Sequence, residues 1–189
     1  MMKVVGLTGT IGSGKNLVKE ILMRKFNCYH VTLSDVIRGE MERKKHTFNR
    51  TTLQEMGNEM RRSYGSHILA MLAVEYLPRD KEMIIIDGIR NPGEAEYLRK
   101  KIGEKFVWIA VDAPQQMRFE RAKQRKQHND PETLEEFVAL DERDQGKGEP
   151  EWGQQVGRCM EQADFVIIND GTQEQLEQKI SEIFSRVSI

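Results

Sequence analysis

The stretch VVGLTGTIGSGKNLVKEIL, residues 4–22, joins a short apolar run to an amphipathic segment through a glycine-rich turn. Gly9, Gly14 and Lys15 fit the pattern G-x-x-x-x-G-K, with Gly12 as an additional glycine inside it. Glycines let the backbone wrap around a phosphate group so that its N–H groups point inward, and the N-terminus of the following helix adds partial positive charge. A strand pattern precedes the turn and a helical pattern follows it, which is the context that this motif requires. These residues therefore predict a phosphate-binding loop.

The last position of this motif departs from the usual pattern. Asn16 stands where a Ser or Thr ordinarily places a hydroxyl group on Mg²⁺. An Asn side-chain oxygen is also a ligand for hard cations, but its reach is longer and Mg²⁺ tolerates little geometric error. Two interpretations stay open: Mg²⁺ is retained with an altered ligand, or catalysis is poor. The residues expected to bind ATP, the donor substrate, are Gly9, Thr10, Ile11, Gly12, Ser13, Gly14, Lys15 and Asn16.

Composition places the chain among ordinary globular proteins. Of its 189 residues 38% are hydrophobic and 31% are charged, and the formal net charge is −1. Near-neutrality argues against bulk nucleic-acid binding, and no apolar run approaches the roughly 18 residues of a membrane span. The N-terminus begins with a strand pattern rather than a charged-then-apolar leader, and Cys28 and Cys159 have no metal-binding spacing. We expect one cytoplasmic domain over residues 1–189, a monomer or weak homo-oligomer, without nucleic-acid or membrane partners.

Short apolar runs alternate with amphipathic stretches, a pattern typical of a parallel sheet with helices on both faces. The runs MIIID and FVIIN are continuously apolar, as expected for strands that are buried on both sides. Capping signals support helices between the strands: Asn91 precedes Pro92, and Gln175 follows three residues after Thr172. The sequence thus predicts an α/β protein with strands at residues 3–7, 29–33, 82–87, 105–112 and 164–169.

Two regions lie outside this minimal sheet. Residues 40–77, between the second and third predicted strands, are helical in pattern throughout. Residues 123–157, before the last strand, are very polar and contain the glycines of DQGKGEPEWG. Long polar excursions from a compact domain are commonly lids or binding elements, so we expect one of these roles for each region.

Polar residues follow three of the predicted strands: Asp35 the second, Asp87 the third and Asn169 the fifth. Ligands of doubly wound sheets bind at the carboxyl ends of the strands. We expect Asp87 to hold Mg²⁺ directly or through water, and Asp35 to orient an acceptor or take its proton. Arg38 and Arg90 follow these two aspartates closely and are candidates for binding the acceptor. The alternative for each aspartate is a local role, as a turn former or a helix cap.

Arginines are the second group of candidate residues. Arg118, Arg121 and Arg125 fall on one face of a predicted helix, directly before the second polar region. Such a face is commonly only solvated, but arginines beside a lid can stabilise a transferring phosphoryl group and exclude water. We expect Arg121 and Arg125 to act in this way. Arg61 and Arg62, in the first helical region, are candidates for binding an anionic acceptor, with a solvated surface as the alternative.

Five segments resemble a known group of kinases. GLTGTIGSGK near the start and ADFVIINDGTQEQLEQKI near the end resemble the ends of dephospho-CoA kinases. LSDVIRGEM, RTTLQEMGNEMRRSYG and IIIDGIRNPGEAEYLR resemble dephospho-CoA-kinase-like ATPases, found in archaea and as a domain joined to nucleotide deaminases. The chain is thus similar over most of its length to P-loop kinases of the dephospho-CoA kinase and nucleoside monophosphate kinase group. The resemblance implies a three-layer P-loop sandwich with parallel strands in the order 2-3-1-4-5, a helical acceptor-binding insertion at 40–77 and a lid at 123–157.

The resemblance also implies roles for individual residues. An acidic residue and an arginine after the second strand match the acceptor site, two arginines match the lid, and a loop near the C-terminus matches the surroundings of the donor adenine. The matching residues are, in that order, Asp35 with Arg38, Arg121 with Arg125, and Asn169 with Asp170 and Gly171.

Two functions remain open. The first is ATP-dependent transfer of the γ-phosphoryl group to a small nucleotide-type acceptor. Because DGIRNPGE stands where dephospho-CoA kinases carry an apolar segment with a glutamate, nucleoside monophosphates compete with dephospho-CoA for this role. The second is a non-kinase nucleotide switch or regulatory ATPase, which the substitution at Asn16 favours. Acceptor-dependent ADP production would separate the two. The residues expected to bind the acceptor are Asp35, Arg38, Arg61, Arg62 and Arg90.

Overall fold

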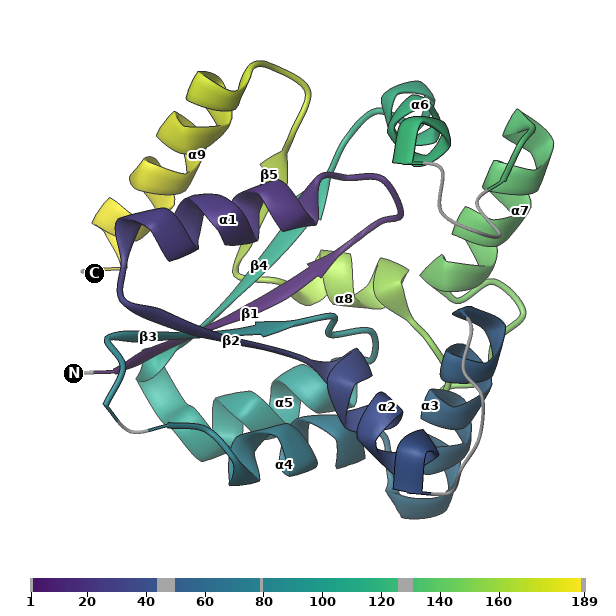
Figure 1. Ribbon diagram of the computed structural model, residues 1–189, viewed down its shortest axis with the longest axis horizontal. Helices are drawn as coiled ribbons and strands as arrows, with labels where there is room; N and C mark the ends of the chain where they lie inside the picture. Colours follow the sequence, from purple (N-terminus) through teal and green to yellow (C-terminus); the bar gives the residue numbers. More distant parts are fainter. Residues whose placement is uncertain (1, 44–49, 79, 126–130, 188–189) are drawn as a thin grey trace.

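The computed structural model describes residues 2–43, 50–78, 80–125 and 131–187. Within these residues five strands form one sheet, with helices on both sides of it (Figure 1). All neighbouring strands pair in parallel, and their order across the sheet is β2-β3-β1-β4-β5. The predicted α/β class and strand order are therefore confirmed. The strands are β1 Lys3–Gly9, β2 Cys28–Thr32, β3 Met83–Asp87, β4 Phe106–Asp112 and β5 Phe165–Ile168.

The sheet buries apolar side chains on both faces, which explains the continuously apolar runs in the sequence. Successive strand residues point to opposite faces, so Val4 and Ile84 enter one core whereas Val5 and Ile85 enter the other. Three helices cover the first face: α4 Ile68–Glu75, α5 Pro92–Ile102 and α8 Val156–Gln162. Two helices cover the second face: α1 Lys15–Lys25 and α9 Gln173–Arg186.

The remaining α-helices lie beyond the carboxyl ends of the strands (Figure 1). The predicted helical region 40–77 contains the end of α2, all of α3 and all of α4, and its residues 44–49 lie outside the described residues. The predicted lid region 123–157 contains α7, and its residues 126–130 also lie outside the described residues. The acceptor-binding and lid roles stay predictions. The elements introduced here are α2 Leu33–Arg43, α3 Arg50–Tyr64, α6 Gln115–Arg125, α7 Leu134–Gln145 and a short 3₁₀ helix, η1 Gly103–Lys105.

Local signals fix the starts of several helices. The side chain of Asn91 accepts a hydrogen bond from the backbone of Gly93 at the start of α5, with Pro92 in the first turn. Thr172 and Gln175 form a capping box at the start of α9. Both predicted caps are confirmed. None of the described helices combines the length and the apolar character that crossing a membrane requires.

Candidate active site

The glycine-rich loop joins β1 to α1, and its shape depends on residues that lack a side chain. Gly12 and Gly14 have φ angles of 76° and 85°, in the left-handed region that favours glycine. A Cβ atom at Gly12 would collide with the carbonyl oxygen of Arg118, and one at Gly14 would collide with the side-chain amide of Asn169. The loop is therefore a close-packed cradle of backbone, as phosphate binding requires.

Side chains from other segments hold this loop in place. Thr10 donates a hydrogen bond of 2.6 Å from Oγ1 to Oδ1 of Asp112, at the end of β4. Asn169 donates from Nδ2 to the carbonyl oxygen of Ser13 at 2.9 Å. Arg121 donates to the same Ser13 oxygen at 3.4 Å and to the carbonyl oxygen of Asn169 at 3.0 Å. The loop is thus supported from the ends of β4 and β5 and from α6.

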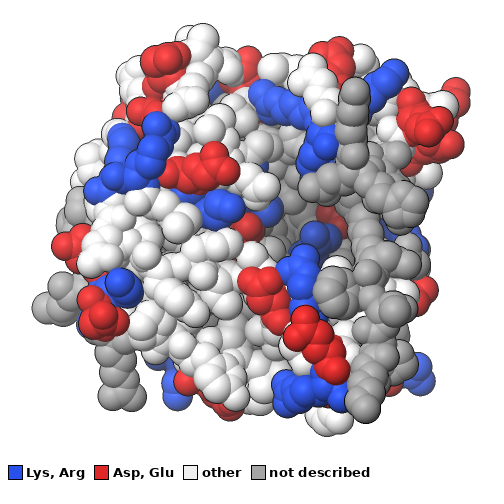
Figure 2. All heavy atoms as spheres, viewed as in Figure 1, with Lys and Arg blue, Asp and Glu red and all other residues white. Residues whose placement is uncertain are grey.

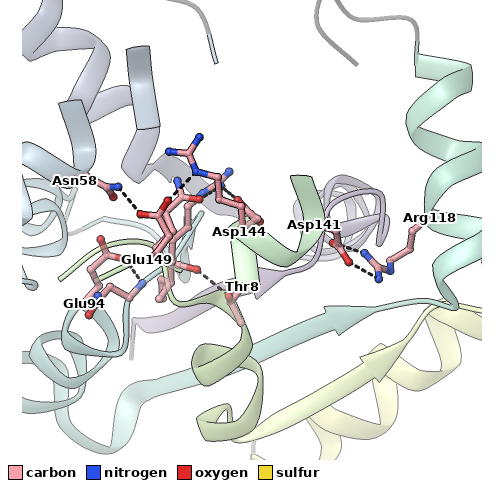
Figure 3. A network of polar contacts seen from close by, with 12 residues as sticks. Thr8, Asn58, Glu94, Arg118, Asp141, Asp144 and Glu149 are labelled. Carbon is pink, nitrogen blue, oxygen red and sulfur yellow. Dashed lines mark hydrogen bonds and ion pairs between the residues drawn. The ribbon is translucent and has the colours of Figure 1, made fainter. Parts of the chain in front are cut away.

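A buried ion pair fastens the loop to α7. Arg118 is 5% exposed and binds both carboxylate oxygens of Asp141 on α7, at 2.5 and 2.8 Å (Figure 3). The same guanidinium donates to the carbonyl oxygens of Ile11, at 3.2 Å, and Ala113, at 2.9 Å. It also lies over the ring of Phe137. The prediction grouped Arg118 with Arg121 and Arg125 on one solvent-facing or lid-facing surface, whereas Arg118 is buried and has a structural role.

Lys15, Asp87 and His30 meet at the base of the loop. Lys15 Nζ lies 2.7 Å from Asp87 Oδ1, and His30 Nε2 lies 3.8 Å from Oδ2. Strand pairing places them together, because Asp87 is aligned with Leu7 of β1 and with Thr32 of β2. Burial alone would raise the pKa of the Asp87 carboxyl, but His30 and Lys15 hold that pKa well below its usual range. Asp87 is therefore an ionised carboxylate beside the phosphate-binding loop.

A cavity of about 550 Å³ runs from the loop to the helices α2, α3 and α4, within the size range of small-molecule sites. All eight loop residues that were expected to bind ATP line it, from Gly9 to Asn16. Figure 2 shows lysine and arginine side chains gathered around a hollow on this face. The arginines that line the cavity are Arg38, Arg61, Arg90, Arg121 and Arg125.

Arg61 lies at the far end of this cavity from the loop. It is 2% exposed, and its Nε and Nη2 atoms each lie 2.8 Å from Oε1 of Glu94, whose side chain is fully buried. The other Glu94 oxygen accepts from the backbone N–H groups of Arg90, at 2.8 Å, and Asn91, at 3.1 Å. One carboxylate thereby joins α3 to the turn that follows β3.

Two further arginines of the cavity wall also have acidic partners. Arg90 Nη1 lies 2.6 Å from Oδ1 of Asp144 on α7 and donates to Gln154 at 3.2 Å. Arg38 Nη1 lies 2.7 Å from Oδ1 of Asp35. Asp35 has a local role as well, because it exchanges hydrogen bonds with Thr32 at the start of α2. The positive charges of Arg38, Arg61 and Arg90, away from the glycine-rich loop, are thus largely compensated by carboxylates.

Some predicted residues do not line the cavity. The exposed Asp35 and the buried Asp87 are not among the lining residues, although each is paired with one, and Asn169 contacts the loop through the carbonyl oxygen of Ser13. Arg62 is exposed, with its guanidinium over the ring of Trp152 and 3.9 Å from Glu59, and the structure does not bring it to the cavity. Gly171 is exposed between β5 and α9 and is also not among the lining residues.

Sequence reasoning missed several residues of this site. Asp112 ends β4 with a carboxylate that holds Thr10, and the rule that identified Asp87 at a strand end would also have found it. His30 lies in β2 outside any motif, and strand pairing brings it to face Asp87. Asp144 and Gln154 carry no recognisable motif, and only the fold brings them to Arg90.

The residues present fit a magnesium ion that also binds substrate. The described residues contain no group of three or more His, Cys, Asp or Glu side chains able to hold a metal ion. Magnesium beside nucleotides is commonly held by only one or two protein groups together with phosphates and water. The ionised Asp87 and the exposed amide of Asn16, on the cavity wall, meet that need.

Comparisons with known proteins identify relatives. Residues 8–138 match the family described as AAA domain. The chain is 33% identical over 190 residues to a UPF0200/UPF0201 protein of Archaeoglobus fulgidus, covering 99% of this chain and 56% of that relative. It is 32% identical over 189 residues to a UPF0200 protein of Thermococcus onnurineus, covering 97% of each.

Solved structures show the same fold. The crystal structure of TT1252 from Thermus thermophilus has a TM-score of 0.63 at 19% identity and covers 97% of both chains. Shikimate kinase from Bacteroides thetaiotaomicron has a TM-score of 0.60 at 16% identity, covering 97% of this chain and 98% of that one. The P-loop kinase-like fold is thereby confirmed, while membership of the dephospho-CoA kinase group stays a prediction. The chain belongs to the AAA domain family and to the UPF0200 proteins.

Proposed function

We propose that this UPF0200 protein is an ATP-dependent kinase that transfers the γ-phosphoryl group to a small nucleotide-type acceptor. The acceptor is a nucleoside or deoxynucleoside monophosphate or dephospho-CoA. The observation that carries the proposal is the continuity of the cavity, which contains the glycine-rich loop at one end and the side chains of α2 and α3 at the other. A nucleotide switch needs only the first end, whereas group transfer needs two substrates held in contact.

The loop supplies the donor site. Backbone N–H groups from Gly12 to Lys15 would bind the phosphates, and the Lys15 ammonium would neutralise their charge. Lys15 is paired with Asp87 in the structure. When phosphate binds, Lys15 must therefore either leave this carboxylate or contact the carboxylate and the phosphate together. Asn16 and Asp87 would hold Mg²⁺, which, when bound, supplies positive charge to the phosphate oxygens.

The transfer step needs few groups beyond this loop. An acceptor oxygen forms the new bond to the γ-phosphorus, the bond from that phosphorus to the β-phosphate oxygen breaks, and ADP leaves. We assign Asp35 to orient the acceptor or to take its proton, because its partner Arg38 lies on the cavity wall. Arg61 and Arg90 line the same end of the cavity and complete the acceptor site.

Arg121 and Arg125 are assigned to the transition state. Both line the cavity on α6, one turn apart. In the part of the chain that the structure describes, Arg121 donates to two backbone carbonyl oxygens and to no carboxylate. Its positive charge is therefore available for charge that develops on a transferring phosphoryl group.

A regulatory ATPase or nucleotide switch is the second candidate, and Asn16 is the observation that favours it. Without a hydroxyl group at this position Mg²⁺ loses an ideal ligand. A switch of this kind would bind ATP and hydrolyse it slowly without needing an acceptor.

One assay separates the two functions. We would measure ADP release from Mg²⁺ and ATP across nucleoside and deoxynucleoside monophosphates, dephospho-CoA and shikimate, with an acceptor-free control. Shikimate is included because proteins of similar fold are shikimate kinases. Turnover that depends on one nucleotide-type acceptor is expected. ATP binding with no acceptor-dependent turnover would favour the switch, and turnover with shikimate alone would contradict the acceptor class.

A further inference from the structure

Two buried polar atoms without hydrogen-bond partners belong to residues that line the cavity. Four such side-chain atoms occur among the described residues: Ser13 Oγ, His30 Nε2, Gln54 Nε2 and Trp108 Nε1. Buried atoms of this kind are uncommon. Each lowers the stability of the fold by about 1–3 kcal/mol unless a ligand or a water molecule forms a hydrogen bond with it. Ser13 and Gln54 line the cavity, and His30 faces Asp87. The Gln54 amide lies on α3, away from the glycine-rich loop, and the mechanism above does not use it.

Apolar side chains form part of the cavity wall at the end that α2, α3 and α4 build. Three helices contribute four hydrocarbon side chains to this end of the cavity, and all of them except Leu53 are buried. The space is also narrow between α2 and α3, because a Cβ atom at Gly57 would lie 2.9 Å from Cδ1 of Ile37. The apolar side chains are Leu33 and Ile37 from α2, Leu53 from α3 and Leu69 from α4.

We infer that this end of the cavity binds a planar heteroaromatic ring, a nucleobase, and that the side-chain amide of Gln54 hydrogen-bonds to the edge of that ring. The inference rests on the proposed function and specifies which part of the acceptor lies here. A nucleobase has apolar faces that fit between leucine and isoleucine side chains, and polar atoms only at its edge. A polyhydroxylated ring lacks such apolar faces, and each hydroxyl group that met one of these hydrocarbon side chains without a hydrogen-bond partner would weaken binding.

The charges of the cavity agree with this orientation. Three arginines of the cavity wall are each paired with a carboxylate, so the acceptor end has little uncompensated charge and suits an uncharged ring. Arg121, on the loop side, binds only backbone carbonyl oxygens within the described residues. The acceptor phosphate would accordingly point toward the loop, where it must lie to receive the γ-phosphoryl group. The three pairs are Arg38 with Asp35, Arg61 with Glu94, and Arg90 with Asp144.

Isothermal titration calorimetry on the full chain without ATP tests the inference independently of turnover. The ligands are nucleoside monophosphates carrying adenine, guanine, cytosine, uracil or thymine, with ribose 5-phosphate as the matched ligand that lacks a base. We expect at least one monophosphate to bind about 10-fold or more tightly than ribose 5-phosphate. Gln54→Met, which keeps the side-chain length but cannot form the hydrogen bond, should weaken that binding about 10-fold.

Two controls locate the effect. ATP affinity should change less than about twofold in Gln54→Met, which shows that the variant is folded and that its loop is intact. Gln178→Met, at an exposed position on α9, should match the wild type with every ligand. Equal binding of ribose 5-phosphate and all monophosphates by the wild-type protein would overturn the nucleobase site. Unchanged monophosphate binding by Gln54→Met would overturn the role of Gln54.

The outcome also distinguishes this inference from the proposed function. If the base makes no difference to binding but an acceptor still stimulates ADP release, the protein is a kinase and the nucleobase site is wrong. If monophosphates bind through Gln54 but no acceptor stimulates ADP release, the site exists and the kinase proposal is wrong.

Discussion

The two ends of the cavity are built by different means. The donor end is a run of eight consecutive residues, Gly9 to Asn16, whose backbone forms the binding surface. The acceptor end consists of side chains from α2, α3, α4 and α7, held by pairs such as Arg61 with Glu94 that lie 33 residues apart. The donor site thus depends on a local backbone shape, and the acceptor site depends on long-range pairing of charges. Substitutions at the donor end should therefore impair ATP binding and turnover, whereas substitutions of the paired residues at the acceptor end should lower stability.

The largest effect is expected at the donor end, from Lys15→Ala. Removing the ammonium group removes the charge that the loop directs at the phosphates, so turnover should fall about 1000-fold or more. Lys19→Ala, one turn further along α1 and away from the cavity lining, should retain turnover within about twofold. Acceptor-dependent ADP release measures both variants, and melting temperatures show whether they are folded. Wild-type-like activity of Lys15→Ala would contradict the kinase proposal.

At the acceptor end, Glu94→Gln should instead reduce stability. The change leaves the Arg61 guanidinium, which is 2% exposed, without its carboxylate. Breaking a buried pair by removing one partner costs about 3–5 kcal/mol, although the retained oxygen of Gln lessens the loss. Urea unfolding should show a decrease of about 2–4 kcal/mol.

The matched control for this change is Glu96→Gln, at an exposed position on the same helix. It should alter the free energy of unfolding by less than about 0.5 kcal/mol. ATP affinity of Glu94→Gln should stay close to that of the wild type under conditions where the variant is folded. A large loss of ATP affinity with unchanged stability would show that the two ends are not independent.

Asn169→Ala should produce a smaller effect that is confined to the donor end. The change removes the hydrogen bond to the carbonyl oxygen of Ser13, which is worth about 1 kcal/mol. We expect KM for ATP to rise about fivefold while KM for the acceptor stays unchanged. Gln178→Ala, at an exposed position on α9, is the control. An equal rise in both KM values would contradict the separation of the two ends.

The smallest effect is expected from Asn16→Ser. A hydroxyl group at this position should improve the fit to Mg²⁺, so turnover at limiting Mg²⁺ should rise a few-fold and the Mg²⁺ concentration for half-maximal rate should fall. Mg²⁺ titrations of turnover for the two proteins measure this. Identical titration curves would mean that Asn16 is already a competent ligand or takes no part in binding the metal.

The sequence indicated the donor end well because its determinants are local. Glycine spacing, the flanking strand and helix patterns and the cap at Asn91 each lie within a short stretch, and strand ends in a parallel sheet converge on one edge. Asp87 was predicted as a Mg²⁺ ligand on that basis, and it lies 2.7 Å from Lys15 of the loop.

The acceptor end was harder to predict because its determinants are distant in sequence. A solvated arginine, a buried ion-paired arginine and a ligand-binding arginine look alike in the sequence, so Arg62 was grouped with Arg61 although only Arg61 lines the cavity. Gln54 belongs to a helical stretch with an apolar face, and nothing in that stretch marks its amide as unpartnered. Asp144 becomes a partner of Arg90 only when α7 is placed against the turn after β3.

The ion pair between Arg118 and Asp141 has a consequence for how such proteins diverge. One guanidinium serves three segments, through Ile11 in the loop, Ala113 after β4 and Asp141 on α7. Losing either charged partner alone would leave the other buried and uncompensated, so the two positions should be inherited together and change together. Transplanting the glycine-rich loop into another protein should likewise succeed only if α6 and α7 accompany it, because part of what shapes the loop lies more than one hundred residues away in the chain.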